Sequence, residues 1–138
     1  MLKVLSSIIV LAGALVLSPV WGGDFDRQSL IDADYKQGRT AFQQRCSACH
    51  TLAEGGSNLV GPNLYGVFGG EAGTKTNFAY SDAMINADFN WTPANVGEFM
   101  ADPPAKVPNT KMIIPEGVPE ADRAAVVSFM MLETGAAD

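Results

Sequence analysis

The chain has 138 residues, of which 47% are hydrophobic, and a formal net charge of −6. This length suffices for one small domain and is short for two. The acidic balance argues against a nucleic-acid partner, because phosphate binding needs a basic surface and an acidic surface repels phosphate.

The first 22 residues have the pattern of an export signal. A short basic start, Met1-Leu2-Lys3, is followed by an apolar stretch from Val4 to Leu17 and by small residues up to Gly22. This order is typical of a secretory signal peptide, so we expect cleavage after Gly22 and a periplasmic protein. The alternative is an uncleaved membrane anchor, since the stretch approaches the roughly 20 apolar residues that a transmembrane helix needs.

The mature chain then begins with an acidic lead-in at residues 23–33, and one domain follows over residues 34–138. Its first helix is expected over 34–46, because Tyr35, Gly38, Phe42 and Cys46 share one helical face. A glycine in mid-helix costs about 1 kcal/mol relative to alanine. Gly38 therefore predicts that another helix crosses closely at this point.

The most informative motif follows this helix. Cys46-Ser47-Ala48-Cys49-His50 holds both cysteines and the single histidine of the chain, and Cys-x-x-Cys-His is the attachment signature of c-type haem. Two thiols one helical turn apart can each add to a haem vinyl group, and the imidazole of His50 can then ligate the iron.

Three other kinds of site can contain such residues. A thioredoxin-like redox pair belongs in a βαβ pattern, which the chain lacks. A zinc site has only three ligands here, one fewer than a closed structural site requires. A disulfide between Cys46 and Cys49 would close a very small loop and stabilise little. Covalent haem attachment is the interpretation that the residues favour.

Residues 51–76 are rich in glycine and lack periodicity, so we expect a long loop that includes Gly61-Pro62-Asn63-Leu64-Tyr65-Gly66. Such a loop is unusual in a compact domain. A haem would supply the apolar core against which it packs.

Further helices are expected in the second half of the chain. A short helix is predicted over 81–86, and a longer one begins at Thr92 as N-cap and stops before Pro103. The proline-rich segment 103–108 is predicted to be non-helical. A last helix opens at Pro119, with an apolar stripe formed by Ala125, Val126, Phe129 and Met130. The fold class is therefore all-α, a small helical fold wrapped around one haem.

The sixth iron ligand has several candidates, since no second histidine exists. Lysine and water are weaker options than the methionines, which are Met84, Met100, Met112, Met130 and Met131. Four of these fall in predicted helices, where methionine usually fills core space. Met112 differs because it lies in an irregular segment bounded by Pro108 and Pro115, which can hold a thioether at a fixed position.

The chain resembles the class I c-type cytochromes, the family of mitochondrial cytochrome c and its bacterial relatives. The likeness runs from about Asp34 to Leu132. It is carried by Gly38-x-x-x-Phe42, Cys46-Ser47-Ala48-Cys49-His50-Thr51, Gly61-Pro62-Asn63-Leu64-Tyr65-Gly66, Gly73, Phe78-Ala79-Tyr80-Ser81-Asp82-Ala83, Trp91, Pro108-Asn109-Thr110-Lys111-Met112, Val126 and Phe129.

This resemblance implies roles for individual residues. Met112 would be the sixth ligand, and the backbone carbonyl of Pro62 would bond the free ring nitrogen of His50. Tyr80 and Trp91 would hydrogen-bond a haem propionate, with Thr110 assisting. Gly38 and Phe42 would cross the last helix.

Several positions depart from the mitochondrial pattern. Phe99 replaces a tyrosine, Met84 an asparagine, Gly70 an arginine near a propionate, and Ile114 an aromatic residue beside the exposed haem edge. The family's ring of docking lysines is reduced to Lys75, Lys106 and Lys111, to which Arg45 adds one more cation. These changes leave the fold unaffected and bear on the potential and the partner.

The resemblance implies a monomeric electron carrier rather than an enzyme, with Fe(II) and Fe(III) alternating under His50/Met112 ligation. Quinol–cytochrome c oxidoreductase is the expected donor, and a terminal oxidase, a photosynthetic reaction centre or a dehydrogenase are the other partners considered. The alternative function is a haem peroxidase or gas sensor from which Met112 dissociates. If residues 1–22 are retained, the carrier would be tethered to the membrane.

Overall fold

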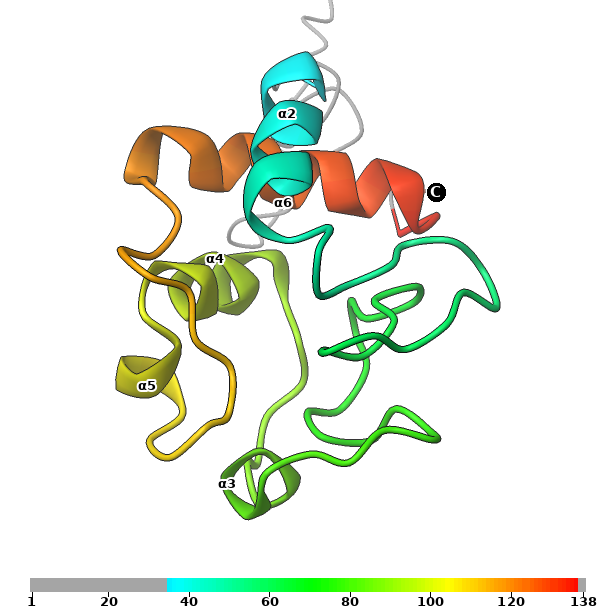
Figure 1. Ribbon diagram of the computed structural model, residues 1–138, viewed down its shortest axis with the longest axis vertical. Coiled ribbons are helices and arrows are strands. Elements are labelled where there is room, and N and C mark those ends of the chain that lie inside the picture. The colour runs from blue at the N-terminus through cyan, green and yellow to red at the C-terminus, as the bar shows by residue number, and fades with distance from the viewer. Residues whose placement is uncertain (1–34, 137–138) are drawn as a thin grey trace, which may run out of the picture.

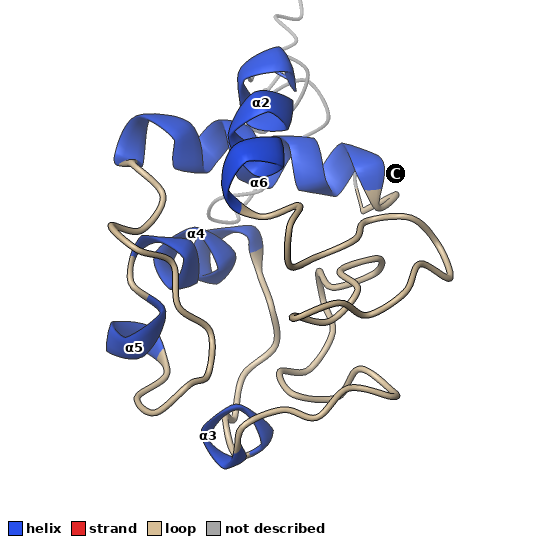
Figure 2. Ribbon diagram, in the orientation of Figure 1, coloured by secondary structure: helices blue, strands red, loops and turns tan. Residues whose placement is uncertain are grey.

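The computed structural model describes residues 35–136. The proposed export segment 1–22, the lead-in 23–33 and Asp34, the first residue of the expected first helix, lie outside this range. The elements in chain order are α2 (Tyr35–Arg45), α3 (Asp82–Ile85), α4 (Pro93–Ala101), α5 (Pro103–Lys106) and α6 (Glu120–Glu133). Figure 2 shows helices joined by long loops in this part of the chain, in which the only β pairing is an isolated bridge between Glu71 and Asn90. The fold is all-α, as predicted.

Helices α2 and α6 cross in contact with each other (Figure 1). The Phe129 ring on α6 packs against Tyr35 and Phe42 of α2, with centroids 5.3 and 5.6 Å apart. A Cβ atom placed on Gly38 would lie 2.1 Å from the backbone oxygen of Ala125. The close crossing predicted from Gly38 is therefore confirmed.

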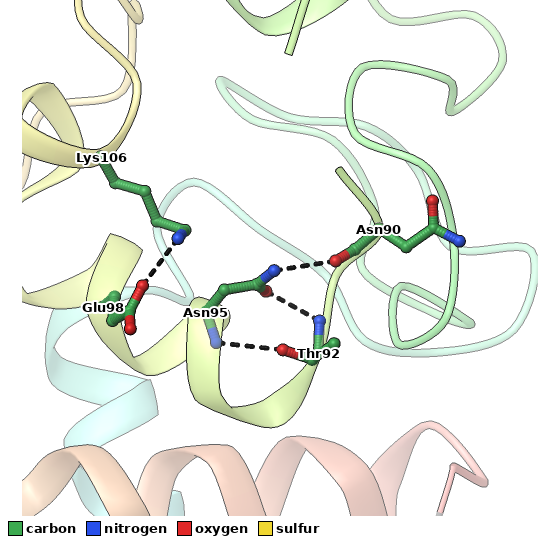
Figure 3. Close-up of polar contacts among 5 residues, drawn as sticks. All are labelled: Asn90, Thr92, Asn95, Glu98 and Lys106. Carbon is green, nitrogen blue, oxygen red and sulfur yellow. Dashed lines mark hydrogen bonds and ion pairs between the residues drawn. The ribbon is translucent and has the colours of Figure 1, made fainter. Parts of the chain in front are cut away.

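Local sequence signals set the bounds of α3 and α4. The Ser81 hydroxyl accepts a hydrogen bond from the Met84 amide and so caps α3. Thr92 and Asn95 form a reciprocal capping box at the start of α4, which Figure 3 shows together with the Asn95 bond to the Asn90 carbonyl. A side-chain cap typically contributes about 1 kcal/mol. Both helices were predicted to within a residue or two.

The prediction that residues 103–108 are non-helical was wrong in part. Residues Pro103–Lys106 form the one-turn helix α5, and the Asp102 carboxylate caps it by accepting from the Ala105 amide at 3.1 Å. Proline is tolerated in the first turn of a helix because the amides there have no intrahelical acceptor. The two prolines therefore start this helix instead of preventing it.

Helix α6 is enclosed more fully than its predicted stripe suggested. All residues from Ala125 to Met131 are buried, and Val126 is completely inaccessible. This helix contacts α2 and α4, so it forms the centre of the main hydrophobic cluster. Within the described range, no helix combines the length and hydropathy needed to cross a membrane.

Candidate haem site

A cavity of about 590 Å³ opens between the helices and the long loop. This volume is within the range of small-molecule and cofactor pockets. Its wall contains all eight residues singled out in the sequence, which are Cys46, Cys49, His50, Pro62, Tyr80, Trp91, Thr110 and Met112. The rest of the lining is mainly apolar, with Phe42, Val67, Phe99 and Ile114 among its members.

The attachment motif continues directly from the end of α2. The Cys46 amide donates to the Phe42 carbonyl at 2.8 Å, and the His50 amide donates to the Cys46 carbonyl at 2.9 Å. These bonds keep the motif in a helical turn, which brings both thiols and the imidazole to one cavity wall. Both cysteines are free thiols, and burial raises the pKa of the Cys46 thiol to about 11. The disulfide interpretation does not describe this structure.

The imidazole of His50 is buried and has a defined tautomer. Its Nδ1 atom lies 2.8 Å from the Pro62 carbonyl oxygen. A carbonyl can only accept, so Nδ1 carries the proton and Nε2 keeps its lone pair. Burial lowers the pKa of His50, although the Pro62 bond opposes this shift. The ring is therefore neutral at pH 7 and can act as a metal ligand through Nε2.

Gly61 and Asn63, on either side of Pro62, were not assigned roles from the sequence. A Cβ atom on Gly61 would lie 2.2 Å from Cε1 of the His50 ring, so only glycine allows the backbone to lie against the imidazole. The buried Asn63 amide donates to the Thr51 hydroxyl at 2.7 Å and to the Ala53 carbonyl at 3.0 Å. These contacts fix the loop that presents the Pro62 carbonyl. The Gly61-Pro62-Asn63 run in the loop after the motif was the sequence signal from which these two roles could have been inferred.

Met112 lies in the segment between α5 and α6. Figure 1 shows this segment on the opposite side of the molecule from the loop that follows α2. The Met112 amide donates to the Thr110 hydroxyl at 3.3 Å, so Thr110 stabilises the turn that carries the thioether. Met84, Met100 and Met130 also line the cavity, but each is buried in a helix. Met131 is buried and does not line it.

Two aromatic residues, Tyr80 and Trp91, each bring a polar group to the wall, and this part of the lining is called the polar wall below. Trp91 packs between the rings of Phe89 and Phe99, at centroid distances of 4.8 and 5.1 Å. Tyr80 is half-buried, and burial raises the pKa of its phenol, while a hydrogen bond from the Lys75 backbone opposes the shift. Both rings are thus held by packing at the cavity wall, where a hydroxyl and an indole N–H can meet a ligand.

The packing of two residues expected near the haem edge is seen only in the structure. Ile114, expected beside an exposed edge, is half-buried against the main core, whereas Ile113 is 78% exposed. Lys106 does not line the cavity and instead pairs with Glu98 at 2.7 Å (Figure 3). Its ammonium also lies 5.2 Å from the centre of the Phe89 ring, so α5 and this ring position it. Neither feature follows from the sequence spacing, because both depend on tertiary packing.

The residues of this cavity fit a covalently attached haem. Two thiols one turn apart, a neutral buried imidazole, an apolar wall and a thioether supplied from a second loop match the chemistry of haem attachment and ligation. The fold and the site therefore define a small all-α protein with a c-type haem site.

Comparison with known proteins agrees with this class. The sequence profile of the cytochrome c family matches residues 35–132. The chain is 38% identical to cytochrome c of Kluyveromyces lactis over 96 residues, covering 70% of this chain and 87% of the yeast protein. It is 44% identical to the cytochrome c-type cyt cy of Rhodobacter capsulatus over 101 residues, covering 72% of this chain and 49% of that protein. It is 46% identical to cytochrome c2 of Blastochloris viridis over 80 residues, covering 58% and 62% of the two chains.

The chain belongs to the cytochrome c family. Members of this family carry electrons on one covalently attached haem c, so haem c is the cofactor of this protein. The predicted fold, family and cofactor are confirmed. The relatives come from both eukaryotes and bacteria.

Proposed function

We propose that this protein is an exported single-haem electron carrier in which Cys46 and Cys49 attach the haem and His50 and Met112 ligate its iron. The observation that carries the proposal is the shared cavity: the motif lines it from the turn that follows α2, and Met112 lines it from the segment between α5 and α6. When bound, the haem iron supplies a one-electron Fe(II)/Fe(III) couple.

The two proposed ligands favour the reduced state. The Pro62 carbonyl holds the His50 proton on Nδ1 and leaves Nε2 as the basic nitrogen. The Met112 thioether is soft and uncharged, and His50 is neutral, so neither ligand offsets the positive charge of ferric iron. Methionine and histidine together are known to raise haem potentials.

The polar wall is proposed to receive the haem carboxylates. Tyr80 and Trp91 offer an O–H and an N–H from half-buried rings, and each group can donate to a carboxylate oxygen. Thr110, whose hydroxyl accepts from the Met112 amide, keeps its own O–H as a further donor. Burying a carboxylate is costly unless it is hydrogen-bonded.

A carrier explains the ligand set better than an enzyme does. If side chains hold both axial positions, neither is open to peroxide or a gas. The sequence contains one histidine, which is the proposed proximal ligand, so no second imidazole is present to assist O–O cleavage. The peroxidase or gas-sensor alternative therefore gains no support from the chain.

The compartment and partners follow from the N-terminal pattern and the family. Residues 1–22 have signal-peptide features, which support a periplasmic location. Redox proteins are the partners, with quinol–cytochrome c oxidoreductase as the proposed donor. A terminal oxidase, a photosynthetic reaction centre or a dehydrogenase is proposed as a further redox partner, and the protein is proposed to act as a monomer.

Haem attachment is tested on the denatured protein. We expect one haem per chain to remain with the polypeptide through acid–acetone extraction, because thioether bonds survive unfolding. Replacement of Cys46 or Cys49 by alanine should leave one thioether and a less stable holoprotein, measured by thermal unfolding. Free extraction of haem from the wild-type protein would contradict covalent attachment.

Apolar contact is proposed to dominate docking of the redox partner. Val60 is 80% exposed and Ile113 is 78% exposed, and both line the cavity, which places them at its mouth. Among the residues that line the cavity, only two cations are exposed, Arg45 and Lys111. Few cations are therefore left to steer an acidic partner.

Reduction by purified quinol–cytochrome c oxidoreductase of the same host, measured by stopped flow, tests this surface. We expect the rate to fall only weakly with added salt, since salt screens charge over about 8 Å at physiological ionic strength and affects apolar contact less. Ile113→Ser should slow the reaction several-fold. Ile85→Ser is the matched control, because Ile85 is 59% exposed but does not line the cavity. A steep salt dependence, or equal effects of the two variants, would contradict apolar docking.

A further inference from the structure

Three cationic side chains in the described part of the chain are half-buried, and two of them have a carboxylate partner. Lys106 pairs with Glu98 at 2.7 Å, and Arg123 lies 3.8 Å from Glu120. The third, Lys75, has no carboxylate within ion-pair distance among residues 35–136. Because removing a charge from water is costly without a partner, Lys75 is the exception that needs explanation.

Lys75 lines the haem cavity. Its ammonium donates to the backbone carbonyl of Tyr65, another residue of the same long loop. A carbonyl accepts one hydrogen bond here but carries no charge, and an ammonium has three N–H donors. Lys75 therefore keeps both an unneutralised charge and free donors beside the cavity.

The neighbours of Lys75 are the residues of the polar wall. The Lys75 backbone adjoins the Tyr80 phenol and acts to lower its pKa. The preceding part of the loop is tied to Trp91 by two backbone bonds, from the Gly69 amide to the Trp91 carbonyl at 2.7 Å and from the Trp91 amide to the Gly70 carbonyl at 2.8 Å. Lys75, Tyr80 and Trp91 thus belong to one connected region of the lining.

The other charged groups of the lining are less suited to pair with a buried anion. Arg45 is exposed, adjoins the attachment cysteine and donates to the Gly117 carbonyl at 3.3 Å. Lys111 is exposed, and its ammonium lies 3.4 Å from the Tyr80 carbonyl. Glu71 is exposed and would repel an anion. Gly70, which lines the cavity, contributes no charge.

We propose that Lys75 forms an ion pair with a haem propionate and so supplies the counter-charge of the cofactor in this protein. The inference rests on the proposed haem-carrier function. In it, Tyr80 and Trp91 supply neutral hydrogen bonds to the carboxylate, and Lys75 supplies the positive charge. The ammonium would also disfavour the extra positive charge of ferric iron, so it raises the reduction potential.

The test compares the midpoint potentials of holoprotein variants by redox titration at low and high salt. Lys75→Gln removes the charge, and Lys75→Arg keeps it. Lys36→Gln is the control, because it removes the same charge from a residue that is exposed on α2 and does not line the haem cavity. Visible spectra of each variant show separately whether haem is attached and whether methionine ligates its iron. Failure of the proposed haem-carrier function can therefore be told apart from failure of the proposed ion pair.

We expect the potential to fall about four times as far in Lys75→Gln as in Lys36→Gln. The charge of Lys75 acts through an effective dielectric constant of about 20 near the protein, whereas the charge of the exposed Lys36 acts through one of about 80, as in water. The shift should persist at high salt, and Lys75→Arg should stay close to the wild type. Equal shifts for Lys75→Gln and Lys36→Gln would overturn the proposal. So would a Lys75→Arg variant that attaches haem normally but has the potential of Lys75→Gln.

Discussion

Replacement of Met112 by leucine is expected to abolish the weak far-red absorbance band of the ferric protein and to lower its reduction potential. Leucine keeps the volume of methionine, so packing changes little and only the sulfur is lost. Axial ligands set haem potentials over about 0.8 V, so a shift on the order of 0.1 V or more is expected. Absorbance spectra and redox titration measure the two effects.

The control for this prediction is Met84→Leu. Met84 lines the same cavity and is buried in α3, so the variant removes a sulfur from the wall without removing the proposed ligand. It should keep the far-red band and a potential near that of the wild type. If the band survives in Met112→Leu and disappears in Met84→Leu, the sixth ligand is Met84, and the proposed ligation by Met112 is wrong.

Replacement of Gly38 by alanine is expected to destabilise the holoprotein by about 3 kcal/mol, which is at the upper end of overpacking costs. The added Cβ would lie 2.1 Å from the Ala125 oxygen and 2.9 Å from the Phe129 Cβ. Two of its three nearest atoms are backbone atoms of α6, so the crossing helices must move apart to accommodate it. Guanidinium unfolding followed by circular dichroism gives the change in free energy.

Gly97→Ala is the matched control for the helix crossing. Gly97 also lies inside a helix, α4, but apart from the adjoining residues and backbone of α4 itself no atom lies within 4 Å of the position where its Cβ would be added. Alanine should therefore stabilise the protein by up to about 1 kcal/mol through helix propensity alone. A destabilisation of similar size in both variants would show that the crossing at Gly38 is not the constraint.

Where the signal was local, the sequence predicted the fold well. Thr92 and Pro93 identify the start of α4 from adjacent residues, and Ser81 does the same for α3. The segment 103–106 was predicted wrongly because the prolines were weighed as helix breakers, although Asp102 before them is an N-cap. Two local rules conflict at this segment, and the structure follows the one in which an N-cap residue precedes prolines in the first turn of a helix.

The site was predicted only in so far as its residues belong to a motif or a resemblance. The Cys46–His50 spacing indicates haem chemistry directly, and the structure places Pro62 and Met112 at the same cavity. The role of Asn63 and the unneutralised charge of Lys75 depend on contacts within a loop that has no periodicity. Spacing cannot reveal such contacts, because the loop is ordered by hydrogen bonds and not by a repeating pattern.

Exposure at the cavity mouth was also beyond the sequence. Ile113 and Ile114 are identical in type and adjacent, yet one is exposed and the other packs on the core. Which of the two faces solvent depends on how the segment after Met112 packs against the core. The partner surface therefore had to be taken from the structure.

The visible spectrum of the purified ferrous protein, recorded before and after addition of carbon monoxide, tests the central claim most directly. The claim is that His50 and Met112 occupy both axial positions of a covalently attached haem. The expected result is a six-coordinate ferrous spectrum that carbon monoxide changes little and slowly. Rapid and complete formation of a carbon monoxide complex would contradict it, because the sixth position would then be open or only weakly held by Met112.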